Sequence, residues 1–365
     1  MRHCAVAAAA LLLASLGMSG PARAQPAGTT SEQKIAHSGA VALKDFTFHD
    51  GSHLPELKLG YTTLGEPHRG AGGEIDNAVL LIHGTGGSGA SYLVPEMAKA
   101  LFDPGAPFDK DRYYVILPDM IGHGASSKPS DGLRMAFPAY DLADMVEAQR
   151  RVLVERMGIK RLKLIGGMSM GGMVTFQWAT THPDMAEKFL PIGAYPVEVA
   201  GQNRMQRKLA IDAIKADPAW QGGNYMQQPL SGLRTATSIQ MLMSGSALNL
   251  QTTYPTRETA DRFVERSMAA SLASGRDAND AIYQSDATRT YNPWDGLSRI
   301  RAALLWINFA DDLINPVSLG IADKALARMP NARFVLVPAS EKTRGHGTLG
   351  QPEYWIDEVK RFMAE

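Results

Sequence analysis

Short apolar runs recur along the chain between segments rich in glycine, proline and polar residues, and each run predicts a buried β-strand. The runs lie at residues 78–82, 113–117, 162–165, 189–192, 303–309 and 334–337. Runs of this length that are apolar throughout are typical of strands covered on both faces, as in a parallel sheet. Residues 43–48 and 57–63 predict two further strands, which pair as a hairpin through the turn at Asp50-Gly51.

Segments with helical spacing separate these strands, at 142–157, 173–181 and 354–363. The alternation is interrupted once, because residues from about 199 to 293 contain no buried-strand run and have a mostly helical pattern. Alternating strands and helices predict an α/β fold with a mainly parallel central sheet flanked by helices, and the interruption predicts a helical cap insertion. We therefore expect a core at 41–198 and 296–365 and a cap at 199–295.

The first residues have the pattern of a secretory signal peptide at 1–24. A short basic start precedes an apolar run at 4–18, and Ala22-Arg23-Ala24 forms an A-x-A cleavage site. The run is too short for a membrane span and ends in small residues. We expect cleavage near Ala24-Gln25, a secreted or periplasmic location, and a disordered lead-in at 25–40. The only cysteine, Cys4, leaves with the signal, so the mature chain forms no disulfide.

Composition narrows the class of function. The 365 residues carry no formal net charge, which argues against a nucleic-acid surface or a polybasic membrane contact. His49 and His53 have an H-x-x-x-H spacing but flank a turn, and no H-E-x-x-H is present. We therefore expect no metal site, no cofactor and no membrane span, and a small-molecule acyl substrate as the partner.

A G-x-S-x-G motif, Gly167-Met168-Ser169-Met170-Gly171, follows the apolar run at 162–165 and precedes a helical segment. A sharp strand-to-helix turn of this kind lifts a serine Oγ out of the sheet, as a nucleophile elbow requires. The N-terminus of the following helix directs backbone N–H groups at an oxyanion forming beside Ser169. The alternative is a glycine-rich turn whose serine only caps the helix.

A nucleophilic serine requires a base and an orienting acid. His346 lies after the last predicted strand and between two glycines, and Asp312 follows the strand at 303–309. The chain order Ser169, Asp312, His346 is that of the α/β-hydrolase arrangement. Asp311 is the alternative candidate for the triad acid. We expect the aspartate that is not the acid to cap the turn.

Two backbone N–H groups are expected to form the oxyanion hole, that of Met170 and that of Thr85 in the glycine-rich loop after residues 78–82. We interpret His83 in that loop as ordering it by hydrogen bonds, and His123 as structural. The predicted substrate pocket is formed by residues of that loop and of the cap, namely Gly84, Trp220, Tyr225 and Met243. Alternatively, the cap methionines only pack its helices onto the core.

Four stretches are similar to homoserine O-acetyltransferases of the α/β-hydrolase superfamily. They are GGMSMGGMVTFQWATTHPD at 166–184, FPAYDLADMVEAQ at 137–149, AIKADPAWQGGNYMQQPLSGL at 213–233 and NFADDLINP at 308–316. The resemblance implies Ser169, Asp312 and His346 as the triad and an acyl-serine intermediate. It also implies a homodimer built through cap helices, which such proteins often form.

The chain departs from these transferases at three places. Its elbow reads Gly-Gly-Met-Ser where they read Gly-Gly-Ser, and residues 238–245 contain no arginine for a substrate carboxylate. Gly347 follows His346, where they carry an aspartate that binds the amino group of homoserine. A zwitterion without these partners binds poorly, because buried charges need pairing. Residues 277–300 with TRGHGT at 343–348 look instead like exported relatives described as α/β-hydrolases.

These observations favour an exported serine hydrolase that cleaves an ester, or an amide, of a small apolar acyl compound. The alternative is an O-acyltransferase of the homoserine O-acetyltransferase type, which passes the acyl group to an alcohol. The sequence does not separate these two, since they differ only in whether water or an alcohol accepts the acyl group. A binding protein on a hydrolase fold is a third class, against which the complete serine, acid and histidine set argues.

Overall fold

The computed structural model describes residues 36–365. The signal peptide predicted for 1–24, its cleavage site near Ala24-Gln25 and Cys4 lie outside the described residues. Most of the lead-in predicted for 25–40 lies outside them as well.

A single eight-stranded sheet forms the centre of the molecule, with the order β1-β2-β4-β3-β5-β6-β7-β8. Strands β3 to β8 are mutually parallel, whereas β1 and β2 pair antiparallel with each other and β2 pairs antiparallel with β4. This arrangement confirms the predicted mainly parallel sheet. The strands are β1 (His37–Thr47), β2 (His53–Leu64), β3 (Ala78–Ile82), β4 (Tyr114–Pro118), β5 (Leu162–Met168), β6 (Ala186–Ile192), β7 (Ala303–Phe309) and β8 (Ala332–Val337).

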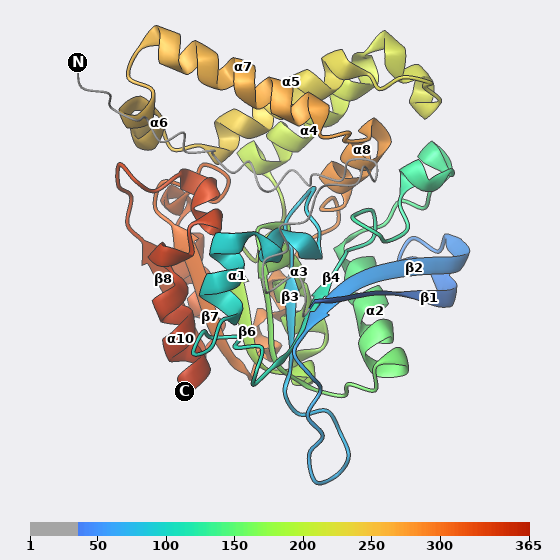
Figure 1. Ribbon diagram of the computed structural model, residues 1–365, viewed down its shortest axis with the longest axis vertical. Coiled ribbons are helices and arrows are strands. Elements are labelled where there is room, and N and C mark those ends of the chain that lie inside the picture. Colours follow the sequence, from blue (N-terminus) through green and yellow to red (C-terminus); the bar gives the residue numbers. More distant parts are fainter. Residues whose placement is uncertain (1–35) are drawn as a thin grey trace, which may run out of the picture.

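Helices cover both faces of the sheet (Figure 1). Alternate residues of the parallel strands enter two separate hydrophobic cores: Val79 and Leu81 of β3 lie in one, and Leu80 and Ile82 in the other. The first core is closed by α1 (Pro95–Phe102) and α10 (Ile356–Ala364), and the second by α2 (Leu142–Arg151), α3 (Met170–Thr181) and α9 (Ile321–Leu326). Burial on both faces explains why these strands are apolar throughout.

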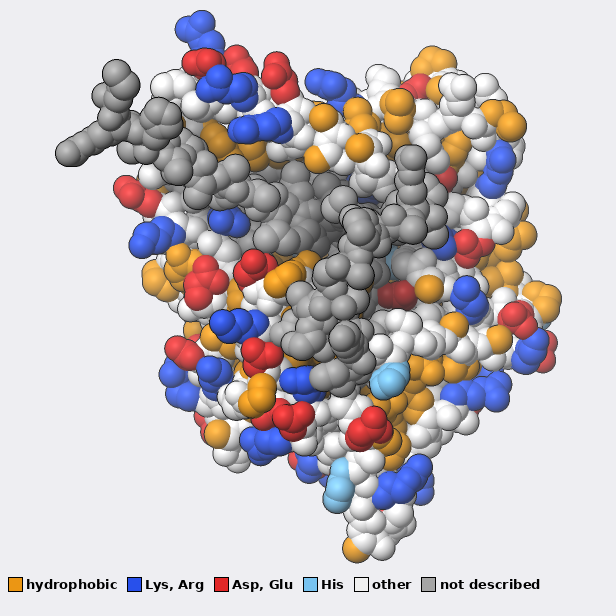
Figure 2. Space-filling model, in the orientation of Figure 1, with side chains coloured by type: hydrophobic (Ala, Val, Ile, Leu, Met, Phe, Trp, Pro, Cys, Tyr) orange, Lys and Arg blue, Asp and Glu red, His pale blue; other side chains and the backbone are white. Residues whose placement is uncertain are grey.

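The chain between β6 and β7 forms the helical cap, which lies over one end of the sheet in Figure 1. Its helices are α4 (Gly201–Ala216), α5 (Leu230–Ser244), α6 (Ala247–Thr253), α7 (Arg257–Ala273) and α8 (Ala278–Asp286). Figure 2 shows hydrophobic side chains among the charged ones along the cap. Exposed large apolar side chains of α4 and α5 are Met205, Leu209, Leu230 and Leu242. The homodimer through the cap helices stays a prediction.

Two details differ from the sequence predictions. Strand β1 begins at His37, which pairs with Thr63, so residues 37–40 belong to the sheet and not to a disordered lead-in. Helices α1 and α9 were not predicted, because each spans only about two turns and its apolar pattern is too short to recognise. Of the helices in the described part of the chain, none is long and apolar enough to cross a bilayer.

Candidate active site

Ser169 occupies the tight turn between β5 and α3, as the elbow motif predicts. Its backbone has φ 56° and ψ −119°, a region that residues with a side chain rarely adopt. The turn is held by close backbone packing, since a Cβ added to Gly171 would lie 2.0 Å from the carbonyl oxygen of Ile82. The glycines flanking Ser169 are therefore required where the helix passes the neighbouring strand β3. The strained position keeps the serine hydroxyl outside the sheet.

Three segments far apart in the sequence bring Ser169, His346 and Asp312 together. His346 Nε2 lies 2.8 Å from Ser169 Oγ, and His346 Nδ1 lies 2.7 Å from Asp312 Oδ2. His346 is in the turn Gly345–Gly350 after β8, Asp312 follows β7, and both follow the carboxyl ends of parallel strands. Asp312 and His346 are buried and Ser169 is half-buried. This geometry can pass a proton from the serine to the imidazole while the carboxylate orients the ring.

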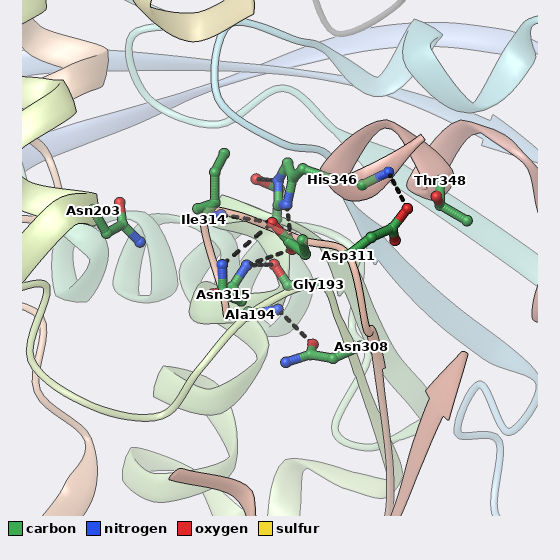
Figure 3. A network of polar contacts seen from close by, with 12 residues as sticks. Gly193, Ala194, Asn203, Asn308, Asp311, Ile314, Asn315, His346 and Thr348 are labelled. Carbon is green, nitrogen blue, oxygen red and sulfur yellow. Dashed lines mark hydrogen bonds and ion pairs between the residues drawn. The ribbon is translucent and has the colours of Figure 1, made fainter. Parts of the chain in front are cut away.

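The two aspartates that the sequence left open have different contacts. Asp312 Oδ1 accepts hydrogen bonds from the backbone N–H of Ile314 (2.7 Å) and of Asn315 (3.2 Å). Asp311 Oδ2 instead accepts from Thr343 Oγ1 at 2.9 Å and from the Gly345 N–H at 3.2 Å. In Figure 3 the carboxylate of Asp311 points away from the imidazole of His346. Asp312 therefore faces the imidazole, and Asp311 anchors the loop that carries it.

The surroundings of Asp312 favour its ionised form. Burial on its own would raise the pKa of this carboxyl, but the charge of His346 and the hydrogen bonds from His346, Asn315 and Ile314 hold the pKa below its usual value. Asn315 Nδ2 also donates to the Gly193 carbonyl at 2.9 Å and to Asp312 Oδ2 at 3.0 Å, which ties the acid to the loop after β6. The sequence analysis did not single out Asn315, although it lies in the quoted stretch at 308–316.

The predicted oxyanion-hole residues flank Ser169. Met170 is the first residue of α3, so its N–H is among those that have no partner within the helix. Thr85 lies in the loop after β3, next to Gly84, where an added Cβ would come within 3.2 Å of Ser169 Cβ. The Thr85 hydroxyl is buried and has no hydrogen-bond partner among the described residues. The loop thus approaches the nucleophile closely.

His83 orders this loop by hydrogen bonds, which confirms the interpretation from the sequence. Its Nε2 accepts from the Met120 N–H at 3.0 Å, which leaves Nδ1 as the donor to the Gly84 carbonyl at 2.8 Å. The ring of His123 lies 5.0 Å from that of His83, and both are buried. Burial lowers the pKa of both imidazoles, which favours their neutral form. Both ring nitrogens of His83 are engaged in hydrogen bonds, whereas His346 Nε2 lies 2.8 Å from Ser169 Oγ and is placed to act as its base.

A cavity of about 200 Å³ opens at Ser169 and His346 and extends beneath the cap. Most of its wall is apolar, and the larger apolar residues are Val94, Met97, Met168, Ile214, Ile239, Ile314 and Leu349. Gly84, Thr85 and Gly347 also line it, as do two cap arginines, Arg207 and Arg276. The wall contains no aspartate or glutamate among the described residues. Sequence reasoning missed both arginines.

Three of the four predicted pocket residues do not line this cavity, and that prediction was wrong for them. Trp220 Nε1 donates to Asn279 Oδ1 at 2.9 Å, and the Tyr225 hydroxyl donates to Asp277 Oδ2 at 2.7 Å. Met243 Sδ accepts from a glutamine side chain of α4 at 3.3 Å. Buried aromatic residues with a polar group find internal partners, and these fasten the cap helices to one another. Only Gly84 of the predicted set lies in the described wall of the cavity.

Within residues 36–365, no three or more His, Cys, Asp or Glu side chains gather in a group that could hold a metal ion. His49, one of the two histidines with the H-x-x-x-H spacing, pairs with Asp141, its Nδ1 lying 2.9 Å from Asp141 Oδ2. The contact fixes the β1–β2 hairpin to the start of α2.

The chain is similar to known proteins both in sequence and in structure. The family model described as "alpha/beta hydrolase fold" matches residues 77–342. A homoserine O-acetyltransferase of Solidesulfovibrio magneticus is 36% identical over 59% of this chain, and the aligned part spans only 57% of that relative's length. A probable acyltransferase of Methanothermobacter thermautotrophicus is 31% identical over 80% of this chain and 88% of its own. The structure of an acetylester hydrolase from Corynebacterium glutamicum shares the fold, with a TM-score of 0.79, 19% identity, and coverage of 92% of this chain and 98% of that one.

Proposed function

The chain belongs to the α/β-hydrolase fold family, and from that premise we propose that it is an exported serine hydrolase that cleaves an ester, or an amide, of a small apolar acyl compound. One observation carries the proposal. His346 is hydrogen-bonded to Ser169 on one side and to Asp312 on the other, and both Ser169 and His346 line a largely apolar cavity. An activated serine beside such a cavity is suited to acyl transfer.

In the proposed reaction, Ser169 Oγ attacks the carbonyl carbon while His346 Nε2 takes the hydroxyl proton. Asp312 holds the imidazole and stabilises its cation. The N–H groups of Met170 and Thr85 donate to the oxyanion of the tetrahedral intermediate. His346 then gives its proton to the leaving alcohol or amine, which departs and leaves the acyl group on Ser169. Water, deprotonated by His346, attacks the acyl-serine and releases the carboxylic acid.

The alternative is an O-acyltransferase, in which an alcohol takes the place of water in the last step. The names of the relatives from Solidesulfovibrio and Methanothermobacter support this class of reaction. Homoserine as the acceptor is disfavoured, because its ammonium group would meet no carboxylate in the described cavity wall. Gly347 lines the cavity where the resemblance implies an aspartate.

The experiment compares the protein beginning at Gln25 with its Ser169→Ala variant on p-nitrophenyl esters of increasing acyl length. Exposed Ser38 on β1 provides a matched control, Ser38→Ala. We expect turnover that is lost with Ser169 and kept in the control, with an optimum at short acyl chains. Full activity of Ser169→Ala on every cleaved ester would refute the proposal.

Water and alcohol acceptors are separated by the products. The same protein is supplied with ester and a series of alcohols, and then with acetyl-CoA and homoserine. Free acid as the main product supports the hydrolase, whereas an excess of the transfer ester supports the acyltransferase. Acetylated homoserine would contradict the leading proposal.

Export is part of the proposal and rests on the pattern at residues 1–24. The test is the N-terminus of the full chain expressed in a bacterium and recovered from the periplasm. We expect it to begin near Gln25. Recovery of the intact chain from the cytoplasm alone would contradict this part.

A further inference from the structure

Two positive charges line the cavity that contains the proposed nucleophile. Arg207 lies on α4 and Arg276 lies between α7 and α8, and both reach the same cavity as Ser169 and His346. No acidic side chain lines the cavity within the described residues, and most of its wall is apolar. A guanidinium stays charged in proteins, so the cavity is cationic at neutral pH.

Few acceptors or negative groups near Arg276 balance its positive charge in the described part of the chain. Its Nε is buried and has no hydrogen-bond partner within the described residues. The acid whose charge acts on it is Asp280, but both oxygens of that carboxylate accept hydrogen bonds from Ser130, at 2.9 and 2.7 Å. Burial lowers the pKa of Arg276, which reflects the cost of keeping this charge away from water. The Nε–H of Arg276 is thus a buried donor that lacks an acceptor among the described residues.

Arg207 is held by neutral groups only. Its Nε donates to Asn203 Oδ1 at 3.1 Å and its Nη1 to the Ser285 carbonyl at 3.5 Å. The neighbouring carboxylate of Asp286 forms an ion pair with Arg204 at 2.9 Å. Burial, and then repulsion from Arg204, lower the pKa of Arg207 to about 10, so it also remains charged. Its position is fixed, while no carboxylate of residues 36–365 pairs directly with its charge.

Buried charges are normally paired, because leaving one unpaired in an apolar site is costly. A bound carboxylate would supply the missing acceptors through charge-assisted hydrogen bonds. We propose that the substrate of this site is an anion, an ester that carries a carboxylate, with the carboxylate bound by Arg276 and Arg207 and the ester carbonyl at Ser169. The substrate has no ammonium group, because the described wall contains no acidic side chain that could pair with one. This inference rests on the proposed function and refines its substrate class, because the small acyl compound would carry a carboxylate on its acyl or its alcohol side.

The test uses two pairs of esters in which a carboxylate replaces a methyl group. Monoethyl succinate and ethyl butyrate place the difference on the acyl side, and acetoxyacetate and ethyl acetate place it on the alcohol side. Acid release is followed at constant pH, and each kcat/KM is divided by the rate constant of alkaline hydrolysis of the same ester. We expect the anionic ester to be preferred in at least one pair, which also identifies the side that bears the carboxylate.

Substitutions at the arginines then assign the preference. Arg276→Gln and Arg207→Gln should each lower the anionic-to-neutral ratio of kcat/KM by about 10- to 100-fold, and Arg276→Lys should recover part of it. Arg234 on α5 is exposed and does not line the cavity, so Arg234→Gln is the matched control with an unchanged ratio. A preference for the neutral ester in both pairs would overturn the inference. So would equal losses on both esters in the two glutamine variants, since these indicate a structural role.

A binding measurement separates this inference from the proposed function. Titration of acetoxyacetate and of monoethyl succinate into Ser169→Ala by calorimetry needs no turnover. Binding of one of them that is lost in Ser169→Ala/Arg276→Gln supports the anion site even if no ester is hydrolysed. Absence of binding to Ser169→Ala would overturn the anion site even if neutral esters are cleaved.

Discussion

Asp312 and Asp311 are neighbours in sequence, and substitution of each by asparagine gives opposite expected results. In Asp312→Asn, the backbone N–H groups of Ile314 and Asn315 retain the amide oxygen at the position of Oδ1, where they donate at 2.7 and 3.2 Å. The amide NH₂ then occupies the position of Oδ2 and faces His346 Nδ1, which lies 2.7 Å away. An NH₂ group donates there, so Nδ1 becomes the acceptor and the ring proton moves to Nε2.

An imidazole protonated at Nε2 cannot take the proton of Ser169, from which Nε2 lies 2.8 Å away. A wrong tautomer of this kind lowers kcat by about 10⁴-fold, and such a factor corresponds to roughly 5 kcal/mol of transition-state stabilisation. The NH₂ also faces the side-chain donor Nδ2 of Asn315, 3.0 Å from Oδ2. We therefore expect an added loss of folding stability of about 1–3 kcal/mol for the donor left unpaired.

Asp311→Asn should keep most of the activity. Its amide oxygen can replace Oδ2 as the acceptor for Thr343 Oγ1 and the Gly345 N–H, and its NH₂ falls at Oδ1, which has no partner among the described residues. We expect kcat within about 10-fold of the parent, since only the charge assistance of two hydrogen bonds is lost. Stopped-flow and steady-state hydrolysis of p-nitrophenyl acetate by both variants gives kcat, and urea unfolding gives stability. A 10⁴-fold loss in Asp311→Asn, or equal losses in both, would refute the assignment.

Three further predictions concern the turn and the hairpin. Gly171→Ala places a Cβ 2.0 Å from a carbonyl oxygen of β3 and should cost about 3 kcal/mol or more in urea unfolding, whereas Gly350→Ala has open space and should cost little. The free energy of unfolding of Ser169→Gly should be about 1 kcal/mol higher than that of Ser169→Ala, because glycine relieves the strain of φ 56°. Both variants should be inactive, and equal stabilities would show that the turn is unstrained. His49 has its pKa raised by the hydrogen bond to Asp141, so its contribution is complete below the unfolded pKa of about 6.5 and is lost as pH rises through the higher folded pKa. The loss of stability in His49→Gln should thus be a few tenths of a kcal/mol at about pH 5.5 and smaller at about pH 9, since the side chain is 64% exposed; the reverse order would contradict this.

The core of the fold could be predicted because its strands are buried on both faces. The runs at 78–82 and 303–309 match β3 and β7 to the residue, since no amphipathic alternative fits a segment that is apolar throughout. The elbow could also be predicted, because strand, glycines, serine and helix follow one another locally. The chain positions of His346 and Asp312 were found by the rule that functional side chains follow parallel strands.

The cavity wall could not be predicted to the same extent. The aromatic residues Trp220 and Tyr225 have the composition of a pocket, yet their polar groups bond within the cap. Arg207 and Arg276 lie 69 residues apart by number in a block without strands, so the tertiary packing of the cap brings them to one cavity. Periodicity identifies a helix and its apolar face, but it does not determine which cap helices meet or which polar side chains turn inward.

The central claim, that Ser169 carries the acyl group, is tested most directly by trapping the intermediate. The protein is mixed with p-nitrophenyl acetate, quenched in acid within milliseconds and digested, and the peptides are identified by mass spectrometry. The account predicts one acetylated peptide, modified at Ser169, whose amount falls strongly in His346→Ala and which is absent in Ser169→Ala. Continued turnover with Ser169 unmodified, or acetylation of another side chain that matches the burst of p-nitrophenol, would contradict it.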